Sequence, residues 1–305
     1  MFSPDGHALR MPPLSLSVRM QMRRWLCLLS MSLPVLYWFG YVLSKDDGTP
    51  AERKSFVLRG YKRVSPGRMD QLLDMHCSGC ALVSSSGHML GAGAGAEIDQ
   101  TGCVIRMNTA PTRGFEKDVG RRTSVRVVAH SSVLQLIKKE KLFFQDPTNT
   151  TYIFWGPERN MRQDGKGWIF NAILKMAKKY PNVTMYALTK EKVQRCDDVF
   201  QNETGKNRLK SGAYLSTGFF TMILAMEMCD SIYVYGMVND NYCSQANQRS
   251  VPYHYYEKSR SNECKMYKFH EHFRHGGHRF ITEKAIYARW ATRHKIEFKY
   301  PSWSP

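Results

Sequence analysis

The chain has 305 residues, 43% of them hydrophobic, which is enough to bury a sizeable core in one large domain or two ordinary ones. Its formal net charge is +18, and basic proteins commonly bind nucleic acids or anionic surfaces. The positive residues are scattered in short clusters, without a basic helix, zinc-finger spacing or RRM-type aromatic motif. We therefore expect a solvated basic surface and no nucleic-acid partner.

The amino-terminal part has the pattern of a membrane anchor. Residues 1–24 are rich in Met, Pro and Arg, and the nineteen residues at 25–43 carry no charge, close to the ~20 that cross a bilayer. Arginines precede this segment and acidic residues follow it, so the positive-inside rule leaves the amino terminus in the cytosol. We predict a cytosolic tail at 1–24 and a single transmembrane signal anchor at 25–43. A removed signal peptide and a secreted product are the alternative, because residues 42–44 (Val-Leu-Ser) resemble a cleavage site.

Residues 44–70 are polar, with Gly and Pro punctuation and no sustained apolar period, which predicts a short stem. The folded domain is then expected at 71–305. Its first apolar run, 81–83, breaks into Ser84, Ser85, Ser86 and Gly87, and two further runs, at 103–108 and 124–129, also end in polar residues. Such runs are typical of buried strands, whose carboxyl ends face ligands in open α/β sheets. Taken alone, a loop of small residues is more often structural than functional.

Strand and helix patterns alternate through the middle of the domain. Residues 151–156 and 182–188 read as strands, and 169–179 have a helical apolar face. This alternation predicts an open, mostly parallel, Rossmann-like twisted sheet with helices on both faces. The polar segment 196–212 is interpreted as an exposed lid or loop.

A long apolar stretch with helical character follows Ser216, Thr217 and Gly218. Free backbone N–H groups and the helix dipole at such a start form a site for phosphate or carboxylate. The alternative is a simple N-cap, which these residue types provide in most helices. The next apolar run, 231–235, predicts a strand that ends at Gly236, on the sheet edge where a ligand would lie.

Two histidines stand out by position among the ten in the chain. His254 lies in a tyrosine-rich segment, 252–257, and His278 follows two glycines before a predicted helix. Imidazole accepts a proton near neutral pH, although a lone histidine is usually structural. His270 and His275, nearby in sequence, are expected on the surface.

Cysteines and sequons indicate passage through an oxidising compartment. Beyond Cys27 there are seven cysteines, at 77, 80, 103, 196, 229, 243 and 264. The spacing of Cys77 and Cys80 suits half of a zinc site, but no second pair follows, so disulfides are favoured and no metal site is predicted. Sequons place candidate glycans on Asn149, Asn182 and Asn202.

Four blocks carry a family resemblance. They are residues 80–130, residues 214–236, the run His254-Tyr255-Tyr256-Glu257, and the run His278-Arg279-Phe280-Ile281-Thr282-Glu283. In order and content they resemble the long, short, third and very short sialylmotifs of the eukaryotic sialyltransferases, glycosyltransferase family 29. Within that family the chain is most similar to the α-N-acetylgalactosaminide α-2,6-sialyltransferases of the short-stemmed group, types III to VI and above all type IV.

The resemblance implies a GT-A-variant sialyltransferase fold and inverting transfer of sialic acid from CMP-Neu5Ac, with no metal or other cofactor. In the family the histidine at position 278 is the general base and that at 254 contacts the donor phosphate, while Asn108 contacts the nucleotide and Cys80 is joined to Cys229. Many relatives have Gly-Asn-Ser-Gly where this chain has a Ser-Ser-Ser-Gly loop, so a side-chain amide contact from Ser85 is absent. The donor site would be completed by Ser86, Gly87, Ser216, Thr217, Gly218 and Gly236.

These features together predict a Golgi enzyme with type II topology and a lumenal catalytic domain. It would act on the 6-hydroxyl of GalNAc in Neu5Acα2,3Galβ1,3GalNAc ends of O-glycans, gangliosides or both. The alternatives are a catalytically inactive lumenal sialoglycan-binding protein of the same fold and a sialyltransferase of different linkage specificity. A cytosolic nucleotide-binding protein is disfavoured by the anchor, the sequons and the cysteines.

Overall fold

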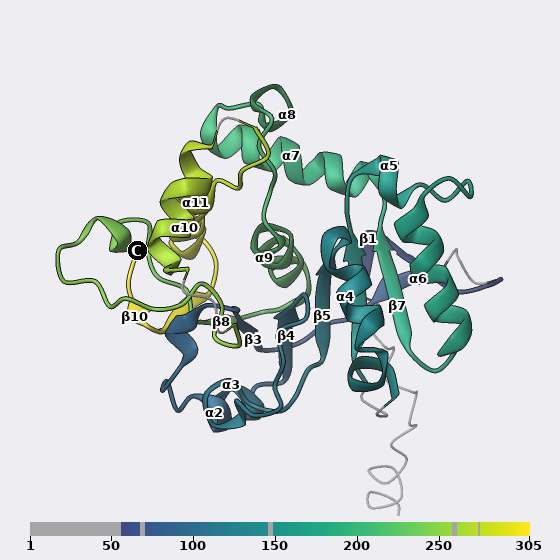
Figure 1. Cartoon of the computed structure of the whole chain (residues 1–305), viewed down its shortest axis with the longest axis horizontal. Coiled ribbons are helices and arrows are strands. Elements are labelled where there is room, and N and C mark those ends of the chain that lie inside the picture. Colours follow the sequence, from purple (N-terminus) through teal and green to yellow (C-terminus); the bar gives the residue numbers. More distant parts are fainter. Residues whose placement is uncertain (1–55, 68–70, 146–148, 258–260, 274) are drawn as a thin grey trace, which may run out of the picture. The chain divides into compact units, whose positions relative to one another are not determined.

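A ten-stranded sheet organises the part of the chain that the computed structural model describes, residues 56–67, 71–145, 149–257, 261–273 and 275–305 (Figure 1). The strand order is β10-β9-β8-β3-β4-β5-β6-β7-β1-β2. The strands are β1 (Val57–Arg63), β2 (Leu72–Asp74), β3 (Cys80–Val83), β4 (Cys103–Met107), β5 (Val125–Ala129), β6 (Thr151–Trp155), β7 (Thr184–Leu188), β8 (Ile232–Tyr235), β9 (Ile296–Tyr300) and β10 (Ser302–Trp303).

The seven central strands, from β9 to β7 in this order, pair in parallel. Antiparallel strands extend the sheet at both ends, with β10 on β9 at one end and β1 on β7 followed by β2 at the other. The predicted open, mostly parallel sheet is therefore confirmed. Strands β3 to β7 of this parallel set are buried on both faces, as expected for a parallel sheet covered by helices.

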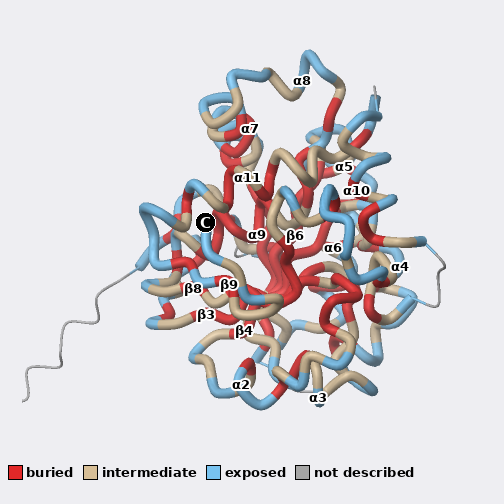
Figure 2. The backbone as a smooth tube through the Cα atoms, turned by 90° about the vertical axis from the view of Figure 1, so that its left-hand side faces the viewer, coloured by how far each residue is buried: buried red, intermediate tan, exposed pale blue. Residues whose placement is uncertain are grey.

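Helices cover both faces of the sheet. They are α2 (Gly95–Gln100), α3 (Glu116–Val119), α4 (Val133–Lys138), α5 (Glu158–Met161), α6 (Trp168–Lys179), α7 (Lys190–Thr204), α8 (Arg208–Ser211), α9 (Thr217–Met228), α10 (Glu263–His272) and α11 (Phe280–Ala291). Figure 2 shows α9 on one side of β3 and β4, and α2 with α3 on the other. The predicted helices at 169–179 and after Ser216 and His278 correspond to α6, α9 and α11.

Side-chain alternation along the strands separates two core layers. Leu82, Ile105 and Val127 pack with α9, whereas Val83 and Val104 pack with α2 and α3 on the opposite face. Helix α9 is the centre of the first layer, since most of its side chains are buried. Its amino terminus is thus held at a fixed place relative to the carboxyl ends of β3, β4 and β5.

The sheet begins upstream of the predicted domain boundary. Strand β1 falls inside the predicted stem at 44–70 but pairs with β7, and Tyr61 is buried. The sequence gives a weak signal here because a register irregularity lies between Leu58 and Lys62, with Gly60 at φ +87° between them. The boundary at residue 71 is therefore wrong, and Ser55–Pro305 form one compact unit.

The predicted lid or loop at 196–212 is also corrected, because it belongs to two helices, α7 and α8. Thr189 caps α7 by accepting a hydrogen bond from the Lys192 N–H, and Gly205 ends it at φ +68°. Its buried face includes Lys192 and Asp197, so the apolar period is interrupted in the sequence. Asp197 is compensated by two hydrogen bonds from the guanidinium of Arg208.

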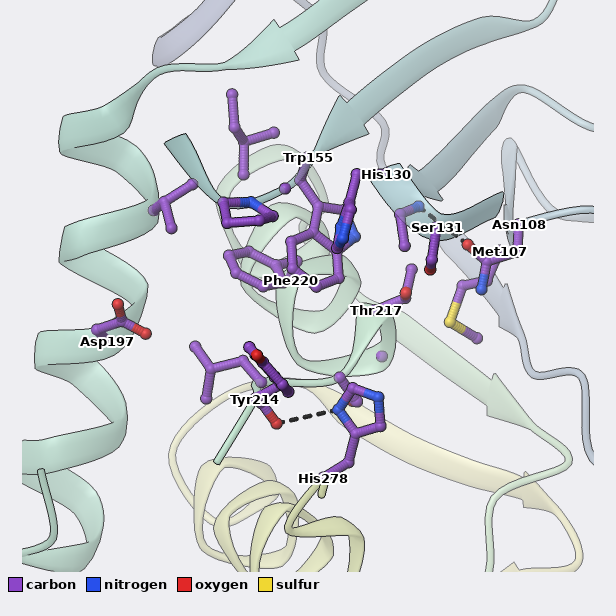
Figure 3. A pocket seen from close by; sticks show the side chains of 18 of the residues that line it. Met107, Asn108, His130, Ser131, Trp155, Asp197, Tyr214, Thr217, Phe220 and His278 are labelled. Carbon is purple, nitrogen blue, oxygen red and sulfur yellow. Dashed lines mark hydrogen bonds between the residues drawn. The ribbon is translucent and has the colours of Figure 1, made fainter. Parts of the chain in front are cut away.

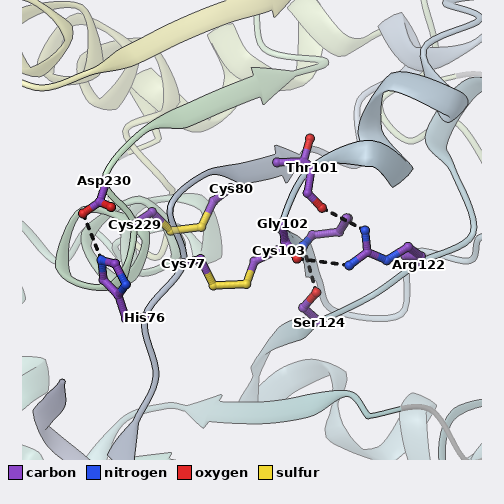
Figure 4. Close-up of a disulfide and its surroundings, with 11 residues drawn as sticks. His76, Cys77, Cys80, Thr101, Gly102, Cys103, Arg122, Ser124, Cys229 and Asp230 are labelled. Carbon is purple, nitrogen blue, oxygen red and sulfur yellow. Dashed lines mark hydrogen bonds and ion pairs between the residues drawn. A yellow bond between two sulfur atoms is a disulfide. The ribbon is translucent and has the colours of Figure 1, made fainter. Parts of the chain in front are cut away.

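Two disulfides lie side by side at the amino ends of β3 and β4 (Figure 4). One joins Cys80 to Cys229, as the family resemblance predicts, and the other joins Cys77 to Cys103. A third joins Cys243 to Cys264, and Cys196 is a buried free thiol. Both cysteines of the considered zinc half-site, Cys77 and Cys80, are thus engaged in disulfides.

The predicted tail and anchor, residues 1–24 and 25–43, lie outside the described residues. Among the residues that are described, no helix has both the length and the apolar character to span a bilayer. The three sequon asparagines, Asn149, Asn182 and Asn202, are all exposed.

The disulfide between Cys80 and Cys229 joins residues 149 positions apart. By loop-closure entropy this crosslink stabilises the fold by about 5 kcal/mol, against about 3.5 kcal/mol for the shorter loop of Cys77 and Cys103. We predict that Cys80→Ala with Cys229→Ala lowers the free energy of unfolding in urea more than the matched pair Cys77→Ala with Cys103→Ala does. Peptide mapping that found Cys80 free or joined to Cys77 would contradict the assignment.

Candidate active site

A cavity of about 1180 Å³ opens beyond the carboxyl ends of the central strands (Figure 3). This is the edge at which open α/β sheets bind ligands. Segments far apart in the chain meet there, from the loop after β3 to helix α11. Most of the residues predicted from sequence line this cleft, namely Ser86, Asn108, Ser216, Thr217, Gly218, Gly236, His254 and His278.

The loop after β3 is fixed by its own small side chains. The Ser84 hydroxyl donates to the Gly236 carbonyl at 2.7 Å and accepts from the Ser86 N–H at 3.1 Å. The Ser86 oxygen in turn accepts from the His88 N–H at 3.0 Å. Gly236 has φ +80°, and a Cβ there would lie 2.5 Å from the Ser84 oxygen. These hydrogen bonds hold the loop after β3 against the carboxyl end of β8.

Gly87 is the predicted donor-site residue that does not line the cleft. Its N–H donates to the Pro252 carbonyl at 3.1 Å, and a Cβ on it would lie 2.2 Å from the same oxygen. The Tyr255 N–H likewise donates to the Ser85 carbonyl at 2.9 Å. The ligand contact expected from Gly87 stays a prediction, although its N–H is already engaged by Pro252. This glycine allows the loop to approach the segment that carries His254.

Asn108 ends β4 in a left-handed conformation, φ 47°, which asparagine tolerates better than most residues. Its side-chain oxygen accepts from the Ala129 N–H at 3.0 Å, tying the end of β4 to that of β5. The amide NH₂ of Asn108 makes no hydrogen bond with any residue in the described ranges. It is left as a donor facing the cleft.

The amino terminus of α9 opens onto the cleft. The Ser216 oxygen accepts from the Phe219 N–H at 3.1 Å, so the N-cap reading is confirmed. Helix geometry leaves the N–H groups of Thr217 and Gly218 without intrahelical partners, and both residues line the cleft. The N-cap role of Ser216 is therefore compatible with the predicted anion site, because the side chain of Ser216 caps the helix while the next two residues line the cleft.

Glu283, on α11, holds this helix start. It is 2% exposed and accepts from the Ser216 N–H at 2.8 Å and from the Ser216 hydroxyl. Burial raises the pKa of Glu283 to about 7, against the opposing effect of these hydrogen bonds. In the sequence, Glu283 is marked only by its place at the end of the fourth block.

His278 lies across the cleft from that helix start (Figure 3). Its Nδ1 is 3.0 Å from the Tyr214 carbonyl, and a carbonyl only accepts, so Nδ1 carries the proton in the neutral ring. Burial lowers the pKa of His278 below its ordinary value. The ring is therefore neutral near pH 7 and its Nε2 has a free lone pair, as a general base requires.

His270, which the sequence analysis places on the surface, packs against His278. The two rings stack at 5.5 Å between centroids with an angle of 21°, and His270 Nδ1 accepts from the His278 N–H at 3.3 Å. The amphipathic period of α10 gives no indication of this contact, which depends on how α10 meets α11. His275 is exposed, as expected.

His254 stands at the wall formed by the tyrosine-rich segment. Its ring stacks on Tyr256 at 5.2 Å and lies 4.3 Å from the ring of Tyr253. Its Nδ1 is 2.8 Å from a carboxylate oxygen of Glu257. The Glu257 contact orients the imidazole so that Nε2 remains available to a ligand.

Two further residues extend the cleft wall. His130, directly after β5, has its pKa lowered by burial and by the nearby Arg159. Trp155, at the end of β6, stacks on Phe220 of α9 at 4.0 Å. The sequence analysis assigned neither a role, although both end predicted strands at the edge where ligands were expected.

Comparison with known proteins agrees with this geometry. The pattern of glycosyltransferase family 29 (sialyltransferase) matches residues 54–294. The chain therefore belongs to the family 29 sialyltransferases.

Two curated relatives and one solved structure show the range of similarity. The rat protein alpha-N-acetylgalactosaminide alpha-2,6-sialyltransferase 3 is 51% identical over 80% of this chain and 79% of its own length. The mouse alpha-N-acetyl-neuraminyl-2,3-beta-galactosyl-1,3-N-acetyl-galactosaminide alpha-2,6-sialyltransferase is 50% identical over 85% of this chain and 72% of its own. A mammalian sialyltransferase structure in complex with Gal-beta-1-3GalNAc-ortho-nitrophenol aligns with 73% of this chain and 70% of that chain, at 22% identity and TM-score 0.47.

The raised pKa of Glu283 predicts a specific pH dependence of stability. The folded protein binds this proton more tightly than the unfolded chain, whose carboxyl has an ordinary pKa of 4.5. The resulting stabilisation is full below about pH 4.5 and is lost as the pH rises through about 7. Relative to Glu283→Gln, the wild-type protein should therefore gain about 2 to 3 kcal/mol between pH 8 and pH 5. Urea unfolding of both proteins at the two pH values measures this, and a constant difference would contradict it.

Proposed function

We propose that this sialyltransferase transfers sialic acid from CMP-Neu5Ac, with inversion, to the 6-hydroxyl of GalNAc in glycans ending in Neu5Acα2,3Galβ1,3GalNAc. The observation that carries the chemistry is His278, neutral and with Nε2 free, across the cleft from the open amino terminus of α9. The proposed α-2,6 linkage and the proposed acceptor are supported by two relatives, 51% and 50% identical to this chain, whose names state them. O-glycans and gangliosides both present such ends.

The donor would lie along the edge formed by the loop after β3, Asn108 and α9. The free N–H groups of Thr217 and Gly218 suit the phosphate of CMP, since the helix dipole favours negative charge there. His254, oriented by Glu257 at 2.8 Å, supplies a further donor to the phosphate when protonated. The free amide of Asn108 supports contact with the nucleotide.

The acceptor would bind on the His278 side. As the 6-hydroxyl oxygen forms its bond to the anomeric carbon of the sialyl group, His278 Nε2 takes the hydroxyl proton. The bond from that carbon to the phosphate oxygen breaks on the opposite face, and CMP leaves with the electron pair. Attack opposite the leaving group inverts the anomeric configuration. The α9 amides and His254 stabilise the charge that develops on the phosphate.

We also propose a Golgi location with single-pass type II topology and a lumenal catalytic domain. The disulfides support an oxidising compartment. The exposed sequon asparagines are compatible with glycosylation. The anchor at 25–43 remains a prediction from the sequence.

Replacing His278 tests the chemistry directly. A base acts in the transition state, so His278→Ala should lower kcat by ~10² to 10⁴ while CMP affinity, measured by calorimetry, stays near the wild-type value. His254→Ala should lower both kcat and CMP affinity, because a phosphate contact exists in the ground state as well as in the transition state. The exposed His275→Ala is the matched control. Near wild-type turnover of His278→Ala with labelled donor would refute the base assignment, and a wild-type protein that binds sialoglycans without transfer would favour the inactive binding protein.

Glycosylation tests the proposed topology. Expression of the full chain in a eukaryotic cell should yield a protein whose apparent mass falls on endoglycosidase treatment, because Asn149, Asn182 and Asn202 would lie in the lumen. The triple Asn→Gln variant should show no such shift. A glycan-free protein whose carboxyl terminus is digested by protease in intact microsomes would overturn the assignment.

A further inference from the structure

Lys284 places a buried cation in the wall of the cleft. The residue is 6% exposed and lines the cavity, yet its ammonium forms no hydrogen bond or ion pair with any residue that the structure describes. Nζ lies 4.8 Å from the centroid of the Tyr267 ring. The carbon chain of Lys284 is covered, while its ammonium end stays open to the cleft. A charged donor that meets no protein acceptor there is free to pair with an anionic ligand.

The geometry of α11 directs this side chain to the cleft. Phe280, Glu283, Lys284 and Tyr287 all line the cavity, and their spacing of three, four and seven residues puts them on one face of a helix. Burial lowers the pKa of Lys284 to about 8, so the ammonium still carries its charge at pH 7. The face therefore presents one positive group between aromatic rings.

The acidic groups near Lys284 are engaged elsewhere. Glu283 accepts two hydrogen bonds from Ser216, and Glu263 accepts one from the Tyr267 hydroxyl at 2.6 Å and lies 3.2 Å from His88. Their charges, with that of Asp240, raise the pKa of Lys284 against the effect of burial. They keep the lysine protonated, but its three N–H donors stay open to a ligand.

We propose that Lys284 binds the carboxylate of a sialic acid in the bound substrates. This rests on the proposed function, in which the donor and the sialylated acceptor each carry such a carboxylate. Lys284 lies on the His278 side, since ring contacts run from His278 to Phe280 at 5.1 Å and from Phe280 to Tyr267 at 5.2 Å. The phosphate, by contrast, has its own donors at the start of α9.

The pairing would also discriminate between acceptors. If the carboxylate belongs to the acceptor, a glycan without sialic acid leaves a buried ammonium unpaired. Sites that lose a buried polar partner reject the incomplete substrate strongly. Lys284 would then select Neu5Acα2,3Galβ1,3GalNAc over Galβ1,3GalNAc.

Kinetics of Lys284→Met and Lys284→Gln test the proposal, with thermal unfolding to confirm that each variant folds. Each is assayed with CMP-Neu5Ac and benzyl glycosides of the sialylated and unsialylated acceptors, and CMP affinity is measured by calorimetry. We expect KM for a sialic-acid-bearing substrate to rise about 10- to 100-fold, from loss of a charged hydrogen bond. The CMP dissociation constant should stay unchanged, and Lys284→Arg should restore part of the loss.

The pattern of change identifies the source of the carboxylate. A rise in KM for the sialylated acceptor alone assigns it to the acceptor, and a rise in donor KM with either acceptor assigns it to the donor. A parallel loss of CMP affinity would show a phosphate contact, and unchanged constants would show that Lys284 only balances Glu263 and Glu283. Either result overturns the proposal.

Failure of the proposed function is separable from failure of this inference. Absence of transfer by the wild-type protein with both acceptors contradicts the function. Calorimetric titrations with the sialylated trisaccharide and with CMP-Neu5Ac then test Lys284 alone, and equal affinities of wild type and Lys284→Met for both ligands would refute its role.

Discussion

The site depends on one buried carboxylate. Glu283 is buried away from water, and its carboxylate oxygens accept hydrogen bonds from the N–H and the hydroxyl of Ser216. These bonds join the first turn of α11 to the start of α9. Helix α9 is in turn packed over β3 to β5, and His278 lies five residues before Glu283. This interaction, together with the contacts of Tyr214 with Gly277 and His278, holds the proposed base close to the start of α9, although the two come from different parts of the chain.

The sequence predicts the centre of this fold better than its margins. Runs such as 81–83 and 127–129 are apolar throughout because parallel strands are covered on both faces, and that pattern is visible in a single sequence. Strand β1 is not predicted because a register irregularity interrupts the alternation of buried and exposed side chains along it. Helix α7 is not predicted from the sequence because its buried face carries Lys192 and Asp197. These two residues form ion pairs with Glu227 and Arg208, which lie elsewhere in the fold.

The same limit applies within the site. The family motifs identify Ser216, His254 and His278, because these motifs can be recognised from the residue types and from their order along the chain. They do not show that Gly87 contacts Pro252, or that His270 stacks on His278. Nor does the sequence distinguish Lys284 from a solvated lysine on a helix surface, since its burial depends on how Tyr267 of α10 meets α11. Tertiary packing supplies what local pattern lacks.

The disulfides have a consequence for how acceptor preference can diverge. The disulfides Cys80–Cys229 and Cys77–Cys103 lie at the amino ends of β3 and β4, on the side of the sheet away from the cleft. The crosslinks of the sheet itself are thereby kept away from the cleft, whereas the third disulfide, Cys243–Cys264, packs with Tyr253, Tyr267 and Phe280 of the cleft wall. The loop after β3 and the segment after β5 line the cleft and carry no disulfide, so their residues can be exchanged while the crosslinked framework stays intact.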